Sequence, residues 1–265
     1  MNLDGRSVLL TGATGGLGQA TARALAARGA RLVLTGRRAE VLEPLAAELG
    51  GRAVVCDLAE ASEVERLLSD CSNADVLVAN AALPGVGELR SFSVEEIDRA
   101  LAVNLRAPIV LARALSAGMA ARGHGHLVFV SSLSGKAASP RGSIYSATKF
   151  GLRGFALGLR EDLRDAGVGV STVFPGFISD AGMFHESGAR AKLPSYVALK
   201  TPDHVAAAVV KAIERNRSEI DVAPLALRLG AAAAGLLPEP LGRLQRRLGS
   251  DEVSRALSEG QRDKR

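Results

Sequence analysis

The sequence predicts an α/β fold: a doubly wound, Rossmann-like parallel sheet of about seven strands with helices on both faces, in a single domain. Short runs rich in Val and Leu alternate with longer segments in which Ala and Leu recur at helical spacing. The short runs are almost continuously apolar, which is typical of parallel strands covered on both faces. The length of 265 residues suits one large α/β domain.

The expected strands and helices alternate along most of the chain. Strands are expected at 7–11, 31–35, 53–57, 75–79, 126–131, 169–174 and 219–222. Helices are expected at 17–28, 39–49, 62–69, 94–122, 145–166 and 202–215. Ligands of such folds bind at the carboxyl ends of the strands, so residues that follow the strands are the site candidates.

Two stretches depart from this alternation. Residues 177–200 mix Gly, Pro and Ser without a clear period, and they follow a strand end where a loop over a substrate pocket is expected. Residues 224–265 contain a Leu-rich and then an Arg-rich segment, and we expect them to form a helical C-terminal extension. This extension could enlarge an interface, cover the pocket or touch a membrane surface, and its mixed Arg and Glu content makes membrane contact the least favoured of the three. The predicted organisation is a cofactor-binding catalytic domain at 1–223, which includes the substrate loop, followed by this extension.

Composition narrows the class of protein. Apolar residues make up 47% of the chain, and the net charge of +5 comes largely from arginines spread along it. The sequence has no basic stripe with interleaved aromatic residues, no apolar run of about 20 residues and no secretory signal at its start. We therefore expect a cytoplasmic protein without a nucleic-acid partner or a membrane span.

The cysteines and histidines indicate neither a disulfide nor a metal site. Cys56 and Cys71 are expected to be reduced thiols that are buried or half-buried. The four histidines lack the spacing of metal ligands on a shared helix face.

A glycine-rich turn follows the first expected strand. Gly12, Gly16 and Gly18 allow the backbone to turn sharply and to approach a pyrophosphate closely. The helix that opens at Leu17 would direct free N–H groups at that anion. A glycine cluster by itself is a weak signal, and a tight turn without a ligand is the alternative. Its place between a strand and a helix favours dinucleotide binding.

The end of the second expected strand favours NADP(H) over NAD(H). An acidic residue that would hold the ribose 2′-hydroxyl is absent there; Gly36 is followed by Arg37 and Arg38. A guanidinium pairs with a 2′-phosphate, so Arg37 is expected to be its main contact. Ordinary surface charge is the alternative. Asp57, after the third strand, is a candidate acceptor for the adenine amino group.

Tyr145 and Lys149 lie four residues apart on one expected helix. An ammonium group near a phenol lowers its pKa and makes it a usable proton donor or acceptor. Tyr196 and Lys200 have the same spacing, so the pair alone is a weak signal. The residue thirteen positions earlier distinguishes the two Tyr/Lys pairs. Before Tyr145 it is Ser132, a hydroxyl at a strand end, whereas before Tyr196 it is Met183, which has no hydroxyl.

Further residues make the pattern specific as a set, although each is weak alone. The set comprises the glycine-rich turn, the Asn-Ala-Ala run at 80–82, Asn104, Ser132, the Tyr145/Lys149 pair, and Pro175 with Gly176. In this order, from about residue 5 to 222, the set resembles the short-chain dehydrogenase/reductase family, and the length fits the family's shorter branch.

The resemblance implies roles for four catalytic residues. Tyr145 would be the general acid in reduction and the general base in oxidation, and Ser132 would hydrogen-bond the substrate oxygen. Lys149 would hold the nicotinamide ribose and lower the pKa of Tyr145, and Asn104 would hold a water that links Lys149 to solvent. The implied activity is hydride transfer between NADP(H) and a carbonyl or secondary alcohol.

The resemblance also implies a cofactor site. Leu83 departs from the family pattern, because Gly is common at that position. Many members also carry a Thr after the Pro-Gly pair that contacts the nicotinamide amide, and Ser179 is the candidate to take its place here. The residues implied to line the cofactor are Gly12, Thr14, Gly16, Leu17, Gly18, Arg37, Arg38, Asp57, Leu58, Asn80, Ala81, Tyr145, Lys149, Pro175, Gly176 and Ile178.

The loop at 177–200 supplies the substrate candidates. Its apolar side chains suit an apolar ketone or alcohol, but plain packing of the loop onto the domain explains them equally well. Arg141 is a candidate contact for an acidic substrate, with surface placement as the alternative. The candidate substrate residues are Ser134, Phe177, Met183, Phe184 and Tyr196.

The resemblance suggests a homodimer or homotetramer in which the helices at 94–122 and 145–166 pair across an interface. Two rival functions stay open. A non-catalytic NADP(H)-binding sensor would share the fold, but no catalytic residue is missing. An epimerase or dehydratase would share the Tyr/Lys pair, but the chain lacks room for a distinct substrate domain.

Overall fold

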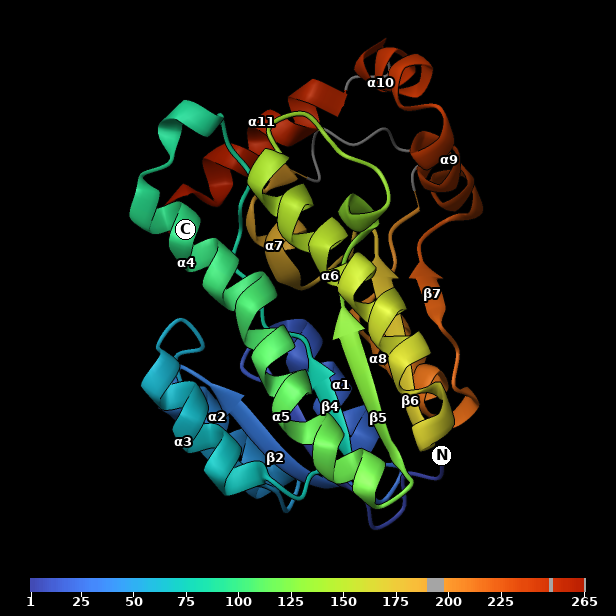
Figure 1. Ribbon diagram of the computed structural model, residues 1–265. Helices are drawn as coiled ribbons and strands as arrows, with labels where there is room; N and C mark the ends of the chain where they lie inside the picture. The colour runs from blue at the N-terminus through green and yellow to red at the C-terminus, as the bar shows by residue number, and fades with distance from the viewer. Residues whose placement is uncertain (190–197, 248–249, 265) are drawn as a thin grey trace.

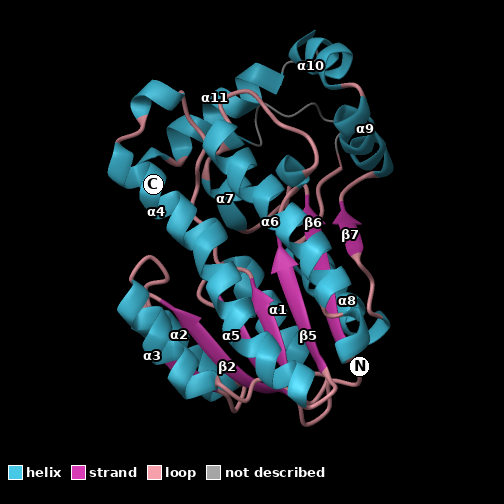
Figure 2. Cartoon of the chain, in the orientation of Figure 1, coloured by secondary structure: helices cyan, strands magenta, loops and turns pink. Residues whose placement is uncertain are grey.

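The computed structural model describes residues 1–189, 198–247 and 250–264, with backbone alone for 244–247. Its centre is a seven-stranded parallel sheet with helices on both faces (Figures 1 and 2). The predicted single-domain Rossmann-like fold is therefore confirmed. The strands are β1 (Ser7–Thr11), β2 (Arg31–Gly36), β3 (Arg52–Val55), β4 (Val76–Ala79), β5 (Gly125–Val130), β6 (Val168–Pro175) and β7 (Glu219–Val222).

The helices occupy the segments in which Ala and Leu recur at helical spacing. Short 3₁₀ turns add η1 (Leu89–Ser91), η3 (Leu133–Gly135), η4 (Arg164–Ala166) and η6 (Arg262–Lys264). The helices are α1 (Gly16–Ala26), α2 (Ala39–Glu48), α3 (Ala61–Cys71), α4 (Val94–Leu101), α5 (Ala107–Ala121), α6 (Ser143–Asp162), α7 (Gly182–Glu186), α8 (Pro202–Arg215), α9 (Leu225–Leu236), α10 (Pro238–Arg247) and α11 (Ser250–Gly260).

The sheet is buried on both faces, which explains its continuous apolar strands. Successive side chains of a strand point to opposite faces. Val8 and Leu10 of β1 therefore pack in one core cluster with Leu25 of α1, whereas Leu9 packs in the other with Leu111 of α5. All five are fully buried, so the helices on each side are held mainly by apolar burial.

The strand order places a crevice between β1 and β4. The order is β3-β2-β1-β4-β5-β6-β7, so the chain winds outward in one direction from β1 and in the other from β4. The connections that leave the carboxyl ends of these two strands diverge, which opens the crevice in which doubly wound folds bind their ligands. The glycine-rich turn follows β1, and Asn80 follows β4.

The helix predicted at 94–122 is a continuous helical run from Val94 to Ala121, but it contains a π-helical turn that was not predicted. A π-helix, η2 (Ala102–Arg106), separates α4 from α5. The wider turn brings Asn104 into the interior, where it is 0% exposed. The helical run Val94–Ala121 is long and apolar enough to cross a membrane by length and composition, contrary to the expectation that the chain has no such segment. In the folded protein, 44% of its most apolar stretch is buried.

The C-terminal helices divide into two parts. α9 and α10 form a hairpin beyond the end of β7 (Figure 1). α11 returns to the body, where Val253 packs in one cluster with Phe184 of α7 and with Ala189. Gln261, which is 1% exposed, donates a hydrogen bond to the Met183 carbonyl oxygen at 2.9 Å. The end of the chain is therefore fastened to the segment after β6.

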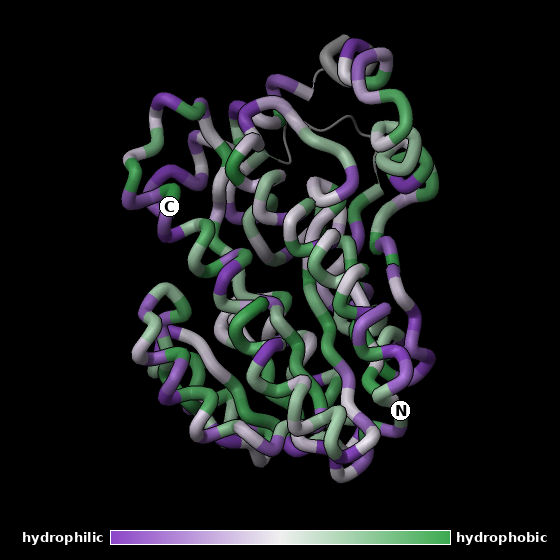
Figure 3. The backbone as a smooth tube through the Cα atoms, viewed as in Figure 1, coloured by the Kyte–Doolittle hydropathy of each residue, from purple (hydrophilic) through white to green (hydrophobic). Residues whose placement is uncertain are grey.

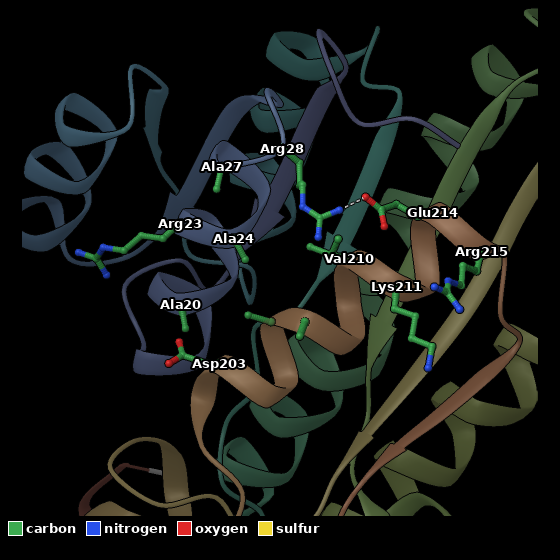
Figure 4. Close-up of a pocket in the computed structure, with 12 residues that line it drawn as sticks. Ala20, Arg23, Ala24, Ala27, Arg28, Asp203, Val210, Lys211, Glu214 and Arg215 are labelled. Carbon is green, nitrogen blue, oxygen red and sulfur yellow. Dashed lines mark hydrogen bonds and ion pairs between the residues drawn. The ribbon is translucent and has the colours of Figure 1, made fainter.

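A groove of about 550 Å³ runs between α1 and α8, away from the residues predicted to be functional (Figure 4). Its floor is formed by alanines such as Ala24 and Ala206, and Arg28 pairs with Glu214 across one end. Because alanine side chains are small, they leave space at the surface where the two helices pack. We therefore interpret the groove as a consequence of helix packing.

Both cysteines are buried free thiols, as predicted. Burial raises the pKa of the Cys56 thiol to about 11, which keeps it protonated at neutral pH. Across the described residues, no group of three or more His, Cys, Asp or Glu side chains is arranged to hold a metal ion.

Candidate active site

Ser132 and Tyr145 meet at the carboxyl end of β5. Ser132 lies two residues after the end of this strand in an extended conformation, and its Oγ accepts a hydrogen bond from the Ser134 backbone N–H at 3.1 Å. Tyr145 lies in the first turn of α6, with its hydroxyl close enough to Ser132 to be influenced by it. The structure therefore brings together two hydroxyl groups that lie thirteen residues apart in the sequence.

Lys149 lies one helical turn after Tyr145 and is 1% exposed. Its Nζ donates a hydrogen bond to the Val130 carbonyl oxygen at 3.1 Å and lies 5.5 Å from the centroid of the Tyr145 ring. Burial lowers the pKa of Lys149 to about 8. The ammonium is thus held beside the phenol by the end of β5, and its charge titrates close to neutral pH.

The predicted pKa shift of Tyr145 is not found. Burial raises the pKa of the phenol to about 12, although the neighbouring Ser132 acts in the opposite direction. The desolvation of the phenol thus disfavours the phenolate more than Ser132 favours it. Tyr145 is therefore a protonated phenol at neutral pH.

Asn104 holds the backbone of Leu83 with both ends of its side-chain amide. Its Oδ1 accepts from the Leu83 N–H at 2.7 Å, and its Nδ2 donates to the Leu83 carbonyl oxygen at 2.9 Å. The same Nδ2 lies 3.5 Å from Oγ1 of Thr148, which donates to the Tyr145 carbonyl oxygen. This pairing accommodates Leu83 at a place where the family commonly has Gly, and the sequence did not reveal it.

Three glycines of the turn after β1 have no room for a side chain. Gly12 has a φ of +65°, and a Cβ there would lie 2.7 Å from the Ala81 Cα. A Cβ at Gly18 would lie 2.1 Å from the Gly12 carbonyl oxygen. A Cβ at Gly16 would lie 2.3 Å from the Ala181 Cβ. The turn is thus packed against the segments that follow β4 and β6.

Thr11 connects β1 to the segment after β4, although it is not among the predicted site residues. Its side chain is 1% exposed, and its Oγ1 accepts hydrogen bonds from the backbone N–H groups of Asn80 at 3.0 Å and Ala81 at 3.1 Å. The Asn80 amide in turn donates to the carbonyl oxygens of Thr11 and Gly12, each at 3.1 Å. The signal was available: a hydroxyl ends an apolar strand, as it does at Ser132.

The residues present fit a phosphate-bearing cofactor. No side chain caps the N-terminus of α1, which begins at Gly16, so its first N–H groups lack a side-chain acceptor. Arg37 and Arg38 are both exposed, and Arg38 donates to the Thr14 carbonyl oxygen at 2.7 Å, which places its guanidinium over the turn. These features combine helix N–H groups with positive charge, as phosphate recognition requires.

Asp57 and Leu58 follow β3. Burial raises the pKa of Asp57, but the Ala59 N–H and the guanidinium of Arg99 outweigh it, so the pKa stays below its usual range. The Arg99 Nη2 lies 2.6 Å from one carboxylate oxygen, and the Ala59 N–H lies 3.0 Å from the other. Asp57 is therefore an ionised acceptor that already has two partners, and Leu58 is 7% exposed.

The predicted substrate residues after β6 mostly pack with the C-terminal helix. Pro175 ends β6 and Gly176 follows it, while Ile178 is 4% exposed and bridges to Lys200. The rings of Phe177 and Phe184 lie 4.8 Å apart in the cluster that includes Val253. Ser179 donates to Asp180 at 2.6 Å. Tyr196, a further substrate candidate, lies outside the described residues.

Arg141 is half-buried and lies near two carboxylates, although its Nε has no hydrogen-bond partner among the described residues. Its backbone is left-handed, with a φ of +57°. Its Nη1 lies 2.9 Å from Glu88, and its Nε lies 3.7 Å from Asp251 of α11. The residue thus joins the loop after β4 to the C-terminal helix, and its charge is already balanced without an acidic substrate.

Known proteins resemble this chain over most of its length. Residues 6–192 match the family model for short chain dehydrogenase. The chain is 36% identical over 229 residues to "Ketoacyl reductase HetN" of a Nostoc species, which covers 83% of this chain and 79% of that protein. It is 32% identical over 214 residues to "NADP-dependent 3-hydroxy acid dehydrogenase YdfG" of Escherichia coli, which covers 76% of this chain and 86% of that protein.

Solved structures agree with these relatives. A short-chain dehydrogenase from Sphingobium yanoikuyae in complex with NADPH is 28% identical, with a TM-score of 0.77 over 88% of this chain and 96% of that chain. The fold and the Ser132–Tyr145–Lys149 arrangement define a Rossmann-like oxidoreductase. This chain belongs to the short-chain dehydrogenase/reductase family.

Proposed function

We propose that the protein transfers a hydride between NADP(H) and a carbonyl or secondary alcohol, with an apolar compound as substrate. The observation that carries this proposal is the meeting of the Ser132 and Tyr145 hydroxyl groups at the carboxyl edge of the sheet, with the Lys149 ammonium 5.5 Å from the centroid of the phenol ring. The glycine-rich turn opens on the same edge of the sheet.

Each side chain has a defined task in this proposal. The nicotinamide, when bound, supplies or accepts the hydride. The Tyr145 phenol gives a proton to the substrate oxygen in reduction and takes it back in oxidation. Ser132 donates a hydrogen bond to the same oxygen and stabilises its developing charge. Lys149 holds the ribose, and Asn104 supports the return of the proton through a water.

The preference for NADP(H) rests on the charges after β2. Arg37 is exposed, and two arginines rather than a carboxylate stand directly after Gly36, so an incoming 2′-phosphate would meet a guanidinium there. Arg38 already lies over the Thr14 carbonyl oxygen and would close the other side of the phosphate.

Fluorescence titration with NADPH and NADH, followed by a panel of apolar carbonyls, tests the proposal. We expect tight NADPH binding, weak NADH binding and consumption of NADPH. Arg37→Ala should weaken NADPH far more than NADH, whereas Lys211→Ala, an exposed cation on α8, should change neither. NADPH binding without any turnover would favour the non-catalytic sensor, and preference for NADH would overturn the assignment of the arginines.

We also propose a homodimer or homotetramer built on α6 and the neighbouring helices. Phe150 and Leu157 of α6 are 40% and 43% exposed and lie seven residues apart on one face. Leu101 of α4 is 38% exposed. Light scattering should report an oligomer in the wild type and a smaller species in Phe150→Glu; a monomeric wild type would refute this interface.

A cytoplasmic location completes the proposal. Cys56 and Cys71 are free thiols, which are typical of proteins in reducing compartments. Fractionation of cells that express the chain tests this location. Recovery of the protein from an extracellular or oxidising compartment would contradict it.

A further inference from the structure

The hairpin of α9 and α10 exposes a row of large apolar side chains. Leu225, Leu229 and Leu236 of α9 are 65%, 62% and 83% exposed. With the exposed Ala232 between them, they are spaced by four, three and four residues, which places all four on one face of the helix. We call these four residues the leucine stripe. A contiguous apolar row at this exposure marks a surface that meets another molecule.

The opposite side of α9 faces the body of the protein. Ala231 is 6% exposed, and Arg228 lies 3.8 Å from Asp221 of β7. A Cβ at Gly235 would lie 4.0 Å from the carbonyl oxygen of Lys136, four residues after Ser132. The inner side of α9 therefore lies beside the carboxyl edge of the sheet that carries Ser132, and Figure 3 shows hydrophobic residues along this helix.

Basic residues accompany the stripe. Residues 225–247 contain four arginines against a single acidic residue, Glu239. Arg228 is paired with Asp221 on the inner side of α9, so the three arginines of α10 are the ones that accompany the stripe. Arg243 of α10 is largely exposed, with only a 3.5 Å approach to Glu239 on the next turn. An apolar helical face accompanied by arginines complements a surface that is apolar below and anionic at its boundary, which describes an anionic lipid bilayer.

A second copy of the chain fits this surface less well. A two-fold dimer places the same patch of both subunits face to face, so the arginines of one hairpin would meet those of the other. Like charges then oppose the association. Anionic headgroups reverse the sign of that interaction while the acyl region still accepts the leucines.

We propose that the leucine stripe of α9 docks the protein on the surface of an anionic membrane. The helix would lie in the boundary between headgroups and acyl chains, and the carboxyl edge that carries Ser132 would lie close to the bilayer. The docking does not depend on the proposed oxidoreductase activity, and it is measured by binding alone.

Co-sedimentation of the full chain with lipid vesicles tests the proposal. Wild type should sediment with vesicles of phosphatidylcholine and phosphatidylglycerol and much less with phosphatidylcholine alone, and high salt should weaken the binding. The double variant Leu225→Glu/Leu229→Glu should lose about tenfold or more of the apparent affinity for vesicles, because two charges replace the leucines that would enter the bilayer.

The matched control is Leu89→Glu/Val94→Glu, which adds the same charges at side chains that are 61% and 67% exposed elsewhere on the surface. It should bind like wild type apart from a modest general loss of positive charge. NADPH titration of each variant shows that the fold is intact. Absence of vesicle binding by wild type, or equal loss in both double variants, would overturn the proposal. So would a concentration-dependent dimer that Leu225→Glu/Leu229→Glu abolishes while vesicle binding persists.

Discussion

The half of the site assigned to the cofactor and the half assigned to the substrate are built differently. In the cofactor half, Thr11, Gly12 and Asn80 are joined by hydrogen bonds between the ends of neighbouring strands. In the substrate half, Phe184 and Met183 are held by Val253 and Gln261, residues that come about 70 positions later in the chain. The first half is fixed by adjacent elements of the sheet, whereas the second depends on the end of the chain.

Because of this difference, we expect the first half to control cofactor affinity and the second to control substrate affinity. The cofactor half is part of the buried sheet, so it cannot move without disturbing the core. The substrate half is an added layer of packing and ion pairs, so it can change shape or specificity while the cofactor stays bound. Variants in the two halves should therefore separate cofactor affinity from substrate affinity.

The largest effect is expected where the two halves meet, at Tyr145. Tyr145→Phe removes the proton donor, so turnover of a carbonyl should fall by about 10² to 10⁴. NADPH binding should stay within a few-fold of wild type, because the ring is retained. Steady-state kinetics and cofactor titration measure the two quantities; a variant that turns over at the wild-type rate would remove Tyr145 from the mechanism.

Within the cofactor half, Gly18→Ala should reduce NADPH affinity by at least about tenfold. The new Cβ would lie 2.1 Å from the Gly12 carbonyl oxygen, so the turn has to shift. Gly158→Ala is the matched control, since a Cβ there meets nothing within 4 Å and lies within α6. It should keep NADPH affinity and raise the free energy of unfolding by about 0.5–1 kcal/mol. Equal NADPH affinity in both variants would refute a close-packed turn.

The pH dependence of reduction should follow Lys149. Its pKa of about 8 means that the ammonium is present below pH 8 and is lost as the pH rises through that value. Tyr145, with a pKa of about 12, stays protonated throughout this range. If the charged lysine is required, kcat/KM at pH 9 should be about a tenth of its value at pH 7.

Lys149→Arg sharpens the same measurement. A guanidinium keeps its charge at every accessible pH, so the decline above pH 8 should disappear even if the maximal rate is lower. A wild-type profile that is level up to pH 10 would show that the Lys149 charge is not needed.

A smaller effect is expected in the substrate half. Val253→Ala removes two methyl groups from the cluster around Phe184, so the segment after β6 should loosen. KM for an apolar carbonyl should rise by roughly two- to tenfold, while the Kd for NADPH stays the same. A parallel loss of NADPH affinity would show that the two halves are not separable.

The sequence was informative wherever a pattern is local. The bounds of β1, β7 and α8 agree with the predicted ones, because β1 is a short run with an apolar centre, β7 alternates polar and apolar residues, and α8 has clear ends. The Ser132–Tyr145–Lys149 set lies within one strand, one loop and one helix, so spacing alone brought it together. The roles of these residues stay predictions until they are measured.

Other features depend on packing between distant segments, which spacing does not encode. The helical pattern at 94–122 continues through the π-helix, because the widened turn arises from the fit of Asn104 against Leu83. The rise in the pKa of Tyr145 comes from burial, which exists only after folding. The packing of α11 against α7 joins two segments that are far apart in the sequence, and nothing in their composition predicts the contact.

Thr11 illustrates how little of a site can be read from shape. Valine would fill the same volume, and it has a high propensity for strands. Yet two backbone N–H groups of the neighbouring connection end on the Thr11 hydroxyl oxygen, and an isosteric methyl group would leave both without an acceptor. The crevice between β1 and β4 thus depends on the lone pairs of a single atom.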